Sequence, residues 1–248
     1  LTRTGFAGNP VGFRAVKLIA EAAAAVPLVL QDSTQRFENH EFLSLLAAPN
    51  GAQARAEFLE GLFGQLLLSG DAYVEAVAGE SGAPFELHVL RSDRMRVVPG
   101  SDGWPIAYEY AVGARKARFD VRSEVSPICH IKSFHPHDDH YGLSPMQAAA
   151  TALDVHNSAS RWSKALLDNA ARPSGAIVVN GSDGQGTLGP EQFQRLQDEM
   201  EAYHQGAKNA GRPMLLEGGL DWKPMGFSPS DMEFQKTKES AAREIAIA

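Results

Sequence analysis

A run of 26 residues without glycine or proline sets the strongest limit on how this chain folds. Residues 146–171 contain neither type, and alanine, the best helix former, is the commonest residue among them. Ser144 is a good N-cap and Pro145 suits the first helical position. The pattern therefore predicts one helix, which at 1.5 Å per residue would be about 40 Å long. Such a rod exceeds the usual three or four turns, and its small side chains allow neighbouring helices to pack closely.

A compact module and a second helix follow the rod. Arg172 and Pro173 end the rod, because proline cannot continue a helix. Ser230 predicts the start of the second helix, with Glu233 three residues later in capping-box spacing. We expect the two long helices to run antiparallel on either side of a β-α-β-β module. The module's strands are predicted at residues 176–179, 213–216 and 221–224, and its helix starts at Pro190 and ends before Gly206.

The region before residue 142 has mixed patterns, with helical spacing first and strand-like segments afterwards. Pro27 ends the first helical segment. The predicted fold class is therefore α+β. Its helices are expected at residues 11–26, 42–46 and 54–68, and its strands at 28–30, 72–78, 85–90, 95–98, 106–112 and 128–132.

Composition excludes several classes of protein. The net charge of −7 argues against a protein that coats DNA, which needs a basic surface to displace phosphate counterions. The longest apolar run is broken by charges and by Pro27, so no membrane span is predicted. No GxxxxGK[ST] motif is present, so the chain is not itself an ATP-driven motor, and no cofactor is predicted. Because the sequence starts at Leu1 and stops inside a helical pattern, we expect a piece of a longer protein.

The stretch HIKSFHPHDDHYGLSP, residues 130–145, raises the question of a metal site. His135, His137, Asp138 and His140 are all metal-ligand types, which leaves a metal-dependent hydrolase as the alternative function. Pro136 breaks the helix that an HExxH-like site needs, and none of the strong ligand spacings is present. The sequence therefore favours a solvated connecting loop, and no metal site is predicted.

Two other features have ordinary interpretations. Cys129 lies in an apolar strand pattern, where a buried, inert thiol is the usual outcome, and no catalytic residue is predicted. Small basic runs at residues 91–96 and 115–118 lack the interleaved aromatic residues of base-stacking modules.

Six stretches, in order along the chain, resemble the portal proteins of tailed bacteriophages. The likeness is to the large portal family of long-tailed phages, prophages and gene-transfer-type particles. The segments at residues 142–145, 169–175 and 209–224 are specific only when taken together. The stretches are NPVGFRAVKLIAEAAAAVPLVL, HEFLSLLAAPNG, EFLEGLFGQLLLSGDAYVEAV, GLSPMQAA, NAARPSGAIVV and NAGRPMLLEGGLDWKPMGFSPSDMEF.

This resemblance implies a structural role, not an enzymatic one. It implies a ring, typically of twelve copies, at one capsid vertex, assembled in the cytoplasm of a bacterial host. Double-stranded DNA would pass through the channel without sequence preference. Further implied partners are the terminase motor, the head–tail connector and the major capsid protein, with no membrane. The implied parts are a wing (1–141), a first stem helix (142–171), a clip (172–227) and the start of a second stem helix (228–248), with the remaining wing and the crown outside these residues.

Two sets of candidate residues follow from this plan. Basic residues on the polar sides of the two long helices would approach DNA in the channel, and polar residues of the clip helix would bind partners. A capsid-associated scaffold without a channel is a further alternative. The channel candidates are Arg161, Lys164, Lys236 and Lys238, and the docking candidates are Glu191, Gln194, Arg195, Asp198 and Glu199.

Overall fold

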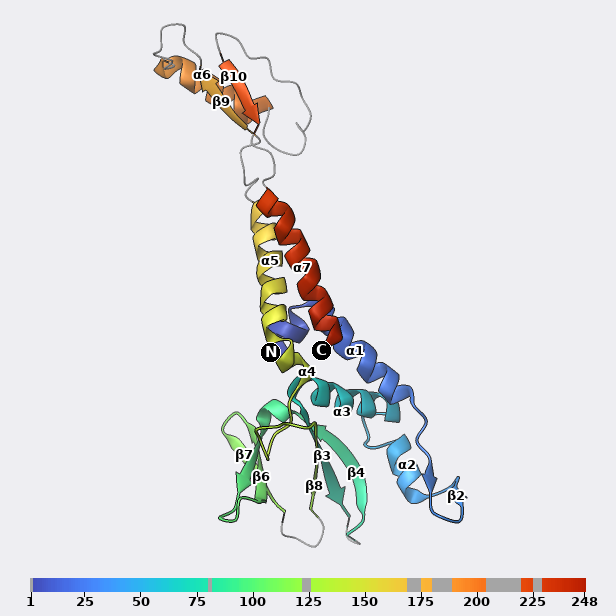
Figure 1. Cartoon of the computed structure of the whole chain (residues 1–248). Coiled ribbons are helices and arrows are strands. Elements are labelled where there is room, and N and C mark those ends of the chain that lie inside the picture. Colours follow the sequence, from blue (N-terminus) through green and yellow to red (C-terminus); the bar gives the residue numbers. More distant parts are fainter. Residues whose placement is uncertain are drawn as a thin grey trace. The chain divides into compact units, whose positions relative to one another are not determined.

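The computed structural model describes residues 2–79, 82–121, 126–168, 175–179, 189–203, 220–224 and 229–248. The chain divides into two compact units (Figure 1). One unit is Leu1–Asn157 with Glu239–Ala248, and the other is Ser158–Lys238.

Two helices, α1 (Pro10–Ala25) and α3 (Arg55–Ser69), form the helical layer of the first unit. Asn9 caps α1, because its Oδ1 accepts the backbone N–H groups of Val11 and Gly12 at 3.0 Å each. The same side chain donates from Nδ2 to Asn157 Oδ1 at 2.9 Å, which ties α1 to a distant part of the chain. The smaller helices are the π-helix η1 (Thr2–Ala7), α2 (Glu41–Ala47) and the 3-10 helix η2 (Ser92–Arg94).

Two three-stranded antiparallel sheets complete the first unit, in the orders β4-β3-β8 and β5-β6-β7. The central strand β3 is covered on both faces, because side chains alternate along a strand. Ala72 and Val74 pack against α3, whereas Tyr73 packs in a separate core with residues of the other sheet. The strands are β3 (Asp71–Ala78), β4 (Pro84–Leu90), β5 (Met95–Pro99), β6 (Pro105–Val112), β7 (Arg115–Asp120) and β8 (Ile128–Lys132).

The predicted rod is broken at one residue. The structure has α4 (Pro145–Ala148) and α5 (Ala150–Asp168), and Ala149 between them has φ −83° and ψ 5°. The prediction of one uninterrupted helix is wrong there, although the Leu153 N–H still donates to the Ala149 carbonyl at 2.9 Å. The 19 residues of α5 give a helix of about 28 Å rather than 40 Å. Residues 169–171, predicted to continue the rod, lie outside the described residues.

The helix α7 (Pro229–Ile247) runs antiparallel to α5, as predicted. In the first unit, Leu153 near the start of α5 shares a core with Ile245 near the end of α7. In the second unit, the Trp162 ring of α5 stacks on the Phe234 ring of α7, with centroids 4.6 Å apart. The helix α7 begins one residue before the cap predicted at Ser230.

A small αβ module precedes α7 in the sequence. The strands β9 (Gly175–Val179) and β10 (Leu220–Pro224) pair antiparallel, and α6 (Pro190–Tyr203) lies between them in the chain. The further strand predicted at 213–216 lies outside the described residues.

Three local predictions were wrong or incomplete. The strand predicted at 28–30 is only the two-residue β1 (Leu30–Gln31), paired with β2 (Arg36–Phe37). The strand β7 was missed, because it is an exposed edge strand whose three cationic side chains hide the alternation. Cys129 is exposed, not buried, because β8 is also an edge strand and Cys129 is on the opposite face from Ile128.

Among the described residues, no helix is long and apolar enough to cross a membrane.

Leu153 tests the packing of α5 in the first unit, because its side chain is 1% exposed among α1, α4 and α7. We expect Leu153→Ala to lower the free energy of unfolding by about 2–5 kcal/mol through loss of burial and creation of a cavity. Val155→Ala, on the same helix and 37% exposed, is the matched control and should change it by about 0.5 kcal/mol or less. Urea unfolding measures both, and equal effects would contradict this packing.

Candidate functional site

The histidine-rich loop uses its polar side chains to hold its own turns. Asp138 Oδ1 accepts the backbone N–H groups of His140 at 2.7 Å and Tyr141 at 2.9 Å. These two bonds hold the pKa of the Asp138 carboxyl below its usual value, since they favour the charged form. The backbone N–H of His137 donates to His135 Nδ1 at 3.1 Å. The loop is therefore organised around backbone groups.

This arrangement gives no support to the hydrolase alternative. Within the described ranges, no group of three or more His, Cys, Asp or Glu side chains is placed to hold a metal ion. The rings of His135 and His137 lie 6.4 Å apart edge to face, and His140 Nδ1 is buried without a hydrogen-bond partner. The four predicted ligand candidates share a loop, but they do not converge on one point.

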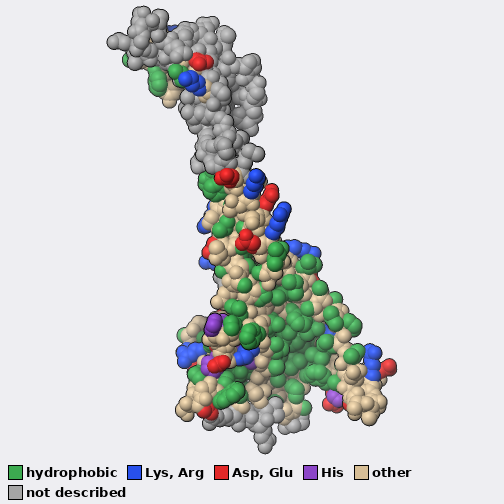
Figure 2. All heavy atoms as spheres, viewed as in Figure 1, with side chains coloured by type: hydrophobic (Ala, Val, Ile, Leu, Met, Phe, Trp, Pro, Cys, Tyr) green, Lys and Arg blue, Asp and Glu red, His purple; other side chains and the backbone are tan. Residues whose placement is uncertain are grey.

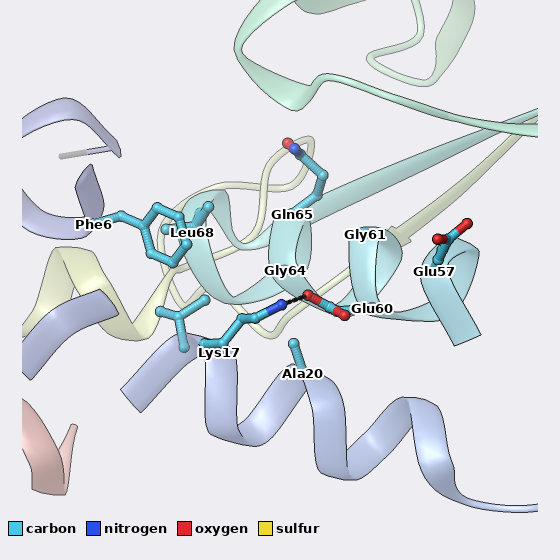
Figure 3. A pocket seen from close by; sticks show the side chains of 10 residues that line it. Phe6, Lys17, Ala20, Glu57, Glu60, Gly61, Gly64, Gln65 and Leu68 are labelled. Carbon is cyan, nitrogen blue, oxygen red and sulfur yellow. Dashed lines mark hydrogen bonds and ion pairs between the residues drawn. The ribbon is translucent and has the colours of Figure 1, made fainter. Parts of the chain in front are cut away.

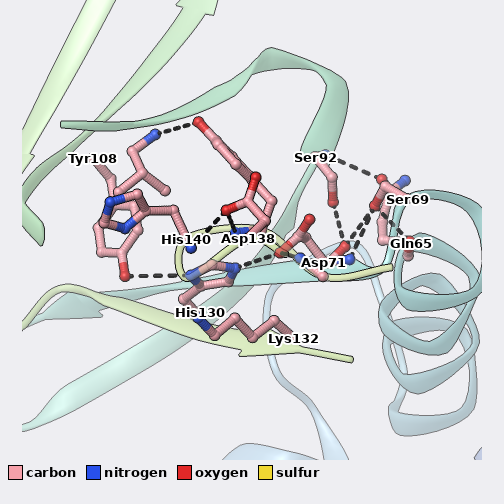
Figure 4. A network of polar contacts seen from close by, with 12 residues as sticks. Gln65, Ser69, Asp71, Ser92, Tyr108, His130, Lys132, Asp138 and His140 are labelled. Atoms are coloured by element: carbon pink, nitrogen blue, oxygen red, sulfur yellow. Dashed lines mark hydrogen bonds and ion pairs between the residues drawn. The ribbon is translucent and has the colours of Figure 1, made fainter. Parts of the chain in front are cut away.

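A buried polar network lies at the base of this loop, and sequence reasoning missed it (Figure 4). The side chains of Asp71 and His130 are 7% and 8% exposed, and His130 Nε2 lies 2.7 Å from Asp71 Oδ1. The same carboxylate oxygen accepts the backbone N–H of Gly142 at 3.0 Å. The backbone carbonyl of Asp71 also accepts the hydroxyls of Ser69 at 2.8 Å and Ser92 at 2.6 Å. One residue therefore joins the end of α3, β3, η2, β8 and the loop before α4.

Aromatic rings fix the orientation of His130. Its ring stacks on Tyr73 with centroids 4.2 Å apart, and Tyr108 meets it edge-on at 5.6 Å. The Tyr108 hydroxyl lies 3.4 Å from His130 Nδ1 and Asp71 Oδ1 lies 2.7 Å from Nε2, so each ring nitrogen faces a polar partner. Burial is the main cause that raises the pKa values of both tyrosines, so both rings stay neutral at physiological pH.

Two glycines allow the backbones to touch at this junction. Gly70 ends α3 with φ 81°, a left-handed conformation that favours glycine. A Cβ added to Gly142 would lie 2.0 Å from the Gly70 oxygen, closer than any side chain tolerates. The Gly70 carbonyl also accepts the N–H of Ser133 at 2.8 Å. Ser144, the predicted N-cap, accepts the Gln147 N–H and donates to the Leu67 carbonyl at 3.1 Å. The start of α4 is thereby fixed against the α3–β3 turn.

A shallow groove between α1 and α3 has a different character (Figure 3). Apolar side chains such as Phe6 and Leu68 line one part, and Gly61 and Gly64 leave the α3 side open. An ion pair between Lys17 and Glu60 crosses it.

The predicted channel and docking residues lie in the second unit. Arg161, Lys164 and Lys236 are exposed and Lys238 is half-buried, on α5 and α7. Arg161 donates to Ser158 Oγ at 3.1 Å. The docking candidates share α6, where Gln194 Nε2 donates to Asp198 Oδ1 at 3.0 Å. Glu191, Gln194, Arg195 and Asp198 are exposed, and the Glu199 side chain lies outside the described residues.

The described residues hold no group of side chains placed to bind a metal ion, and comparison with known proteins supplies the family. The model of the phage portal protein family matches residues 10–248. The chain belongs to the phage portal protein family. The resemblance inferred from the sequence is therefore confirmed, and the mixed α/β fold agrees with it.

Several relatives show how far this likeness extends. A protein of Rickettsia bellii is 40% identical over 244 residues, which are 97% of this chain and 62% of that protein. The portal protein of Enterobacteria phage HK97 is 25% identical over 94% of this chain and 54% of its own length. This portal-family chain therefore spans less than two thirds of these relatives.

Solved structures agree at two levels. A chain in the neck of an empty gene transfer agent (GTA) particle, computed with C6 symmetry, is 72% identical and has a TM-score of 0.82. The match covers 100% of this chain and 66% of that chain. A chain in the neck of a native GTA particle, computed with C12 symmetry, is 70% identical with a TM-score of 0.79. A portal protein from Corynebacterium diphtheriae is 17% identical with a TM-score of 0.58, which shows the shared fold alone.

The contact between Gly70 and Gly142 gives a direct test of the junction. We expect Gly142→Ala to lower the free energy of unfolding by more than about 3 kcal/mol, because the added Cβ meets backbone that cannot turn aside. Gly61→Ala in α3 is the control: its Cβ would meet nothing within 4 Å, and alanine is the better helix former. Denaturant unfolding of both variants measures the difference. A Gly142→Ala variant as stable as the control would contradict the geometry.

Proposed function

We propose that this chain is part of a portal subunit that forms a ring-shaped channel at one capsid vertex. DNA would be packaged, retained and later ejected through that channel. The observation that carries this proposal is the 72% identity, over the full length of this chain, to a chain in the neck of a GTA particle. The role is structural, since a portal acts by shape and position rather than by chemistry at a catalytic site.

The portal plan assigns a part to each region. Residues 1–141 would be the wing, 142–171 the first stem helix, 172–227 the clip and 228–248 the start of the second stem helix. Two observations support this division: α5 and α7 run antiparallel, and the paired strands β9 and β10 lie between them in the sequence with α6. The histidine-rich loop would then be the connection from wing to stem.

The ring would consist of copies of this chain, and we propose twelve. Related necks computed with C6 and with C12 symmetry support a ring, and twelve copies are compatible with both symmetries. A ring is a head-to-tail contact that closes on itself, so each copy presents two different surfaces to its neighbours. The other partners would be the major capsid protein, the terminase motor and the head–tail connector. Assembly would take place in the cytoplasm of the bacterial host, and the finished protein would remain in the particle.

Labelling of intact particles tests the location. The full-length protein, carrying a small C-terminal tag, should bind electron-dense label at one vertex of each particle, at the neck. A major capsid protein tagged in the same way is the control and should be labelled over the whole shell. Label on this protein spread over the shell would instead favour a scaffold without a channel.

We propose that Arg161, Lys164, Lys236 and Lys238 approach the DNA backbone from the stem. Their positive charges on α5 and α7 support this, because lysine and arginine interact with phosphates without reading sequence. Reversing the charge of Arg161 and Lys164 to Glu should lower the DNA content of purified particles several-fold. Lys116→Glu on β7, in the other unit, should leave it unchanged. Equal DNA content in both variants, at equal ring yield, would remove the proposal.

We propose that α6 is the docking surface for the motor and then for the connector. Its exposed polar face, with Glu191, Gln194, Arg195 and Asp198, supports this, and Glu199 would extend it. The double variant Glu191→Arg and Asp198→Arg should keep forming rings but bind the terminase at least about tenfold more weakly, since it reverses the rim charges. Lys223→Glu on the neighbouring β10 is the control. Unchanged binding of both motor and connector would rule α6 out.

A further inference from the structure

The helix α1 has three faces with different environments. The first is buried against α3 and α5 and consists of Gly12, Val16, Ala20 and Ala24, at a spacing of four residues. The second is a narrow charged stripe, in which Glu21 lies 3.6 Å from Arg14 and 3.3 Å from Lys17. Lys17 also pairs with Glu60 of α3.

The third face is apolar and exposed. Leu18, Ile19 and Val26 are 51%, 52% and 55% exposed, and Ala22 and Ala25 are exposed between them. At 100° per residue the four of these side chains that lie in α1 cover about a third of the helix surface, and Val26 follows at the C-cap; none of the five is polar. We call them the α1 apolar face. It continues past the helix end into Leu28 and Val29, and Figure 2 shows hydrophobic side chains gathered over this part of the first unit.

Such a face is unusual on a surface that stays in water. Amphipathic helices of globular proteins keep polar residues opposite their buried stripe, whereas a helix that is apolar nearly all round belongs in an interior. Large contiguous apolar patches on otherwise soluble units mark contact sites. The charged stripe beside the face is already paired within the unit, so little unpaired charge lies at its edge to oppose an apolar neighbour.

We propose that the α1 apolar face packs against the adjacent copy of this chain in the ring. This inference rests on the proposed ring. It identifies one of the two different surfaces through which each copy would contact its neighbours. A related chain, 70% identical over 100% of this one, forms part of a neck computed with C12 symmetry, and such a ring needs a continuous series of subunit contacts. Permanent interfaces are more hydrophobic than transient ones, which fits five adjacent apolar side chains.

A site-specific photo-crosslinker tests which chain covers this face. The probe replaces Ile19 in the full-length protein, rings are purified, and the irradiated sample is separated on a denaturing gel. A covalent product of two chains is expected. Crosslinks confined to single chains would show that another segment of the same chain covers the face. Crosslinks to a different protein would show a different partner. Either result would overturn the proposal. The same probe at Trp104, which is 75% exposed on the β5–β6 turn, is the matched control and should yield little two-chain product.

Substitution tests the same surface without a probe. Leu18→Asp together with Val26→Asp should lower the ring fraction at micromolar concentration at least about tenfold, because charges would be buried without partners. Both positions are exposed in the single chain, so circular dichroism should show an unchanged fold. Trp104→Asp should assemble like the unmodified protein. If the double variant forms rings normally, the α1 face is not a subunit contact but the portal function stands; if the unmodified full-length protein forms no rings, the proposed function itself fails.

Discussion

Asp71 holds together the point at which the parts of the first unit meet. Its buried carboxylate lies against His130 and the Gly142 N–H, and its carbonyl accepts two serine hydroxyls. A buried carboxylate needs such partners, because a buried acceptor left without a hydrogen bond costs about 1–3 kcal/mol or more. The contact of Gly70 with Gly142 places the start of α4 against the turn between α3 and β3. Because α5 follows α4 after a single residue, this junction also fixes the start of α5.

That junction matters for a protein of this family. In the ring proposed above, every copy would have to place its helices at the same position. A joint built from a buried histidine–aspartate contact, stacked rings and touching backbones resists bending, since none of these contacts can shift without losing its partners. The histidine-rich loop is part of this joint: Asp138 closes its turn and Gly142 anchors its end. Its histidines therefore belong to a connection, which explains why so many potential metal ligands fail to converge.

The sequence was informative where local physics decides the structure. The Ser144-Pro145 start of α4, the glycine end of α3 and most strands follow from caps, turns and alternation, and all were predicted. The break at Ala149 was not, because its neighbours are strong helix formers and only packing distinguishes it. The Asp71–His130 pair was also missed, since 59 residues separate its members and neither belongs to a known motif. Gly70, which ends α3 and is followed directly by Asp71, was the one feature of the sequence that pointed to this junction. The exposed face of α1 could not be foreseen, because its apolar periodicity resembles that of a buried helix.

The central claim is that many copies of this protein stand side by side around an open channel. Electron microscopy of the purified full-length protein, averaged in views down the symmetry axis, tests it most directly. The account predicts a closed ring, twelvefold by our proposal, with a central hole wide enough for a DNA duplex. Particles that remain single chains at high concentration, or a closed assembly without a central hole, would contradict it.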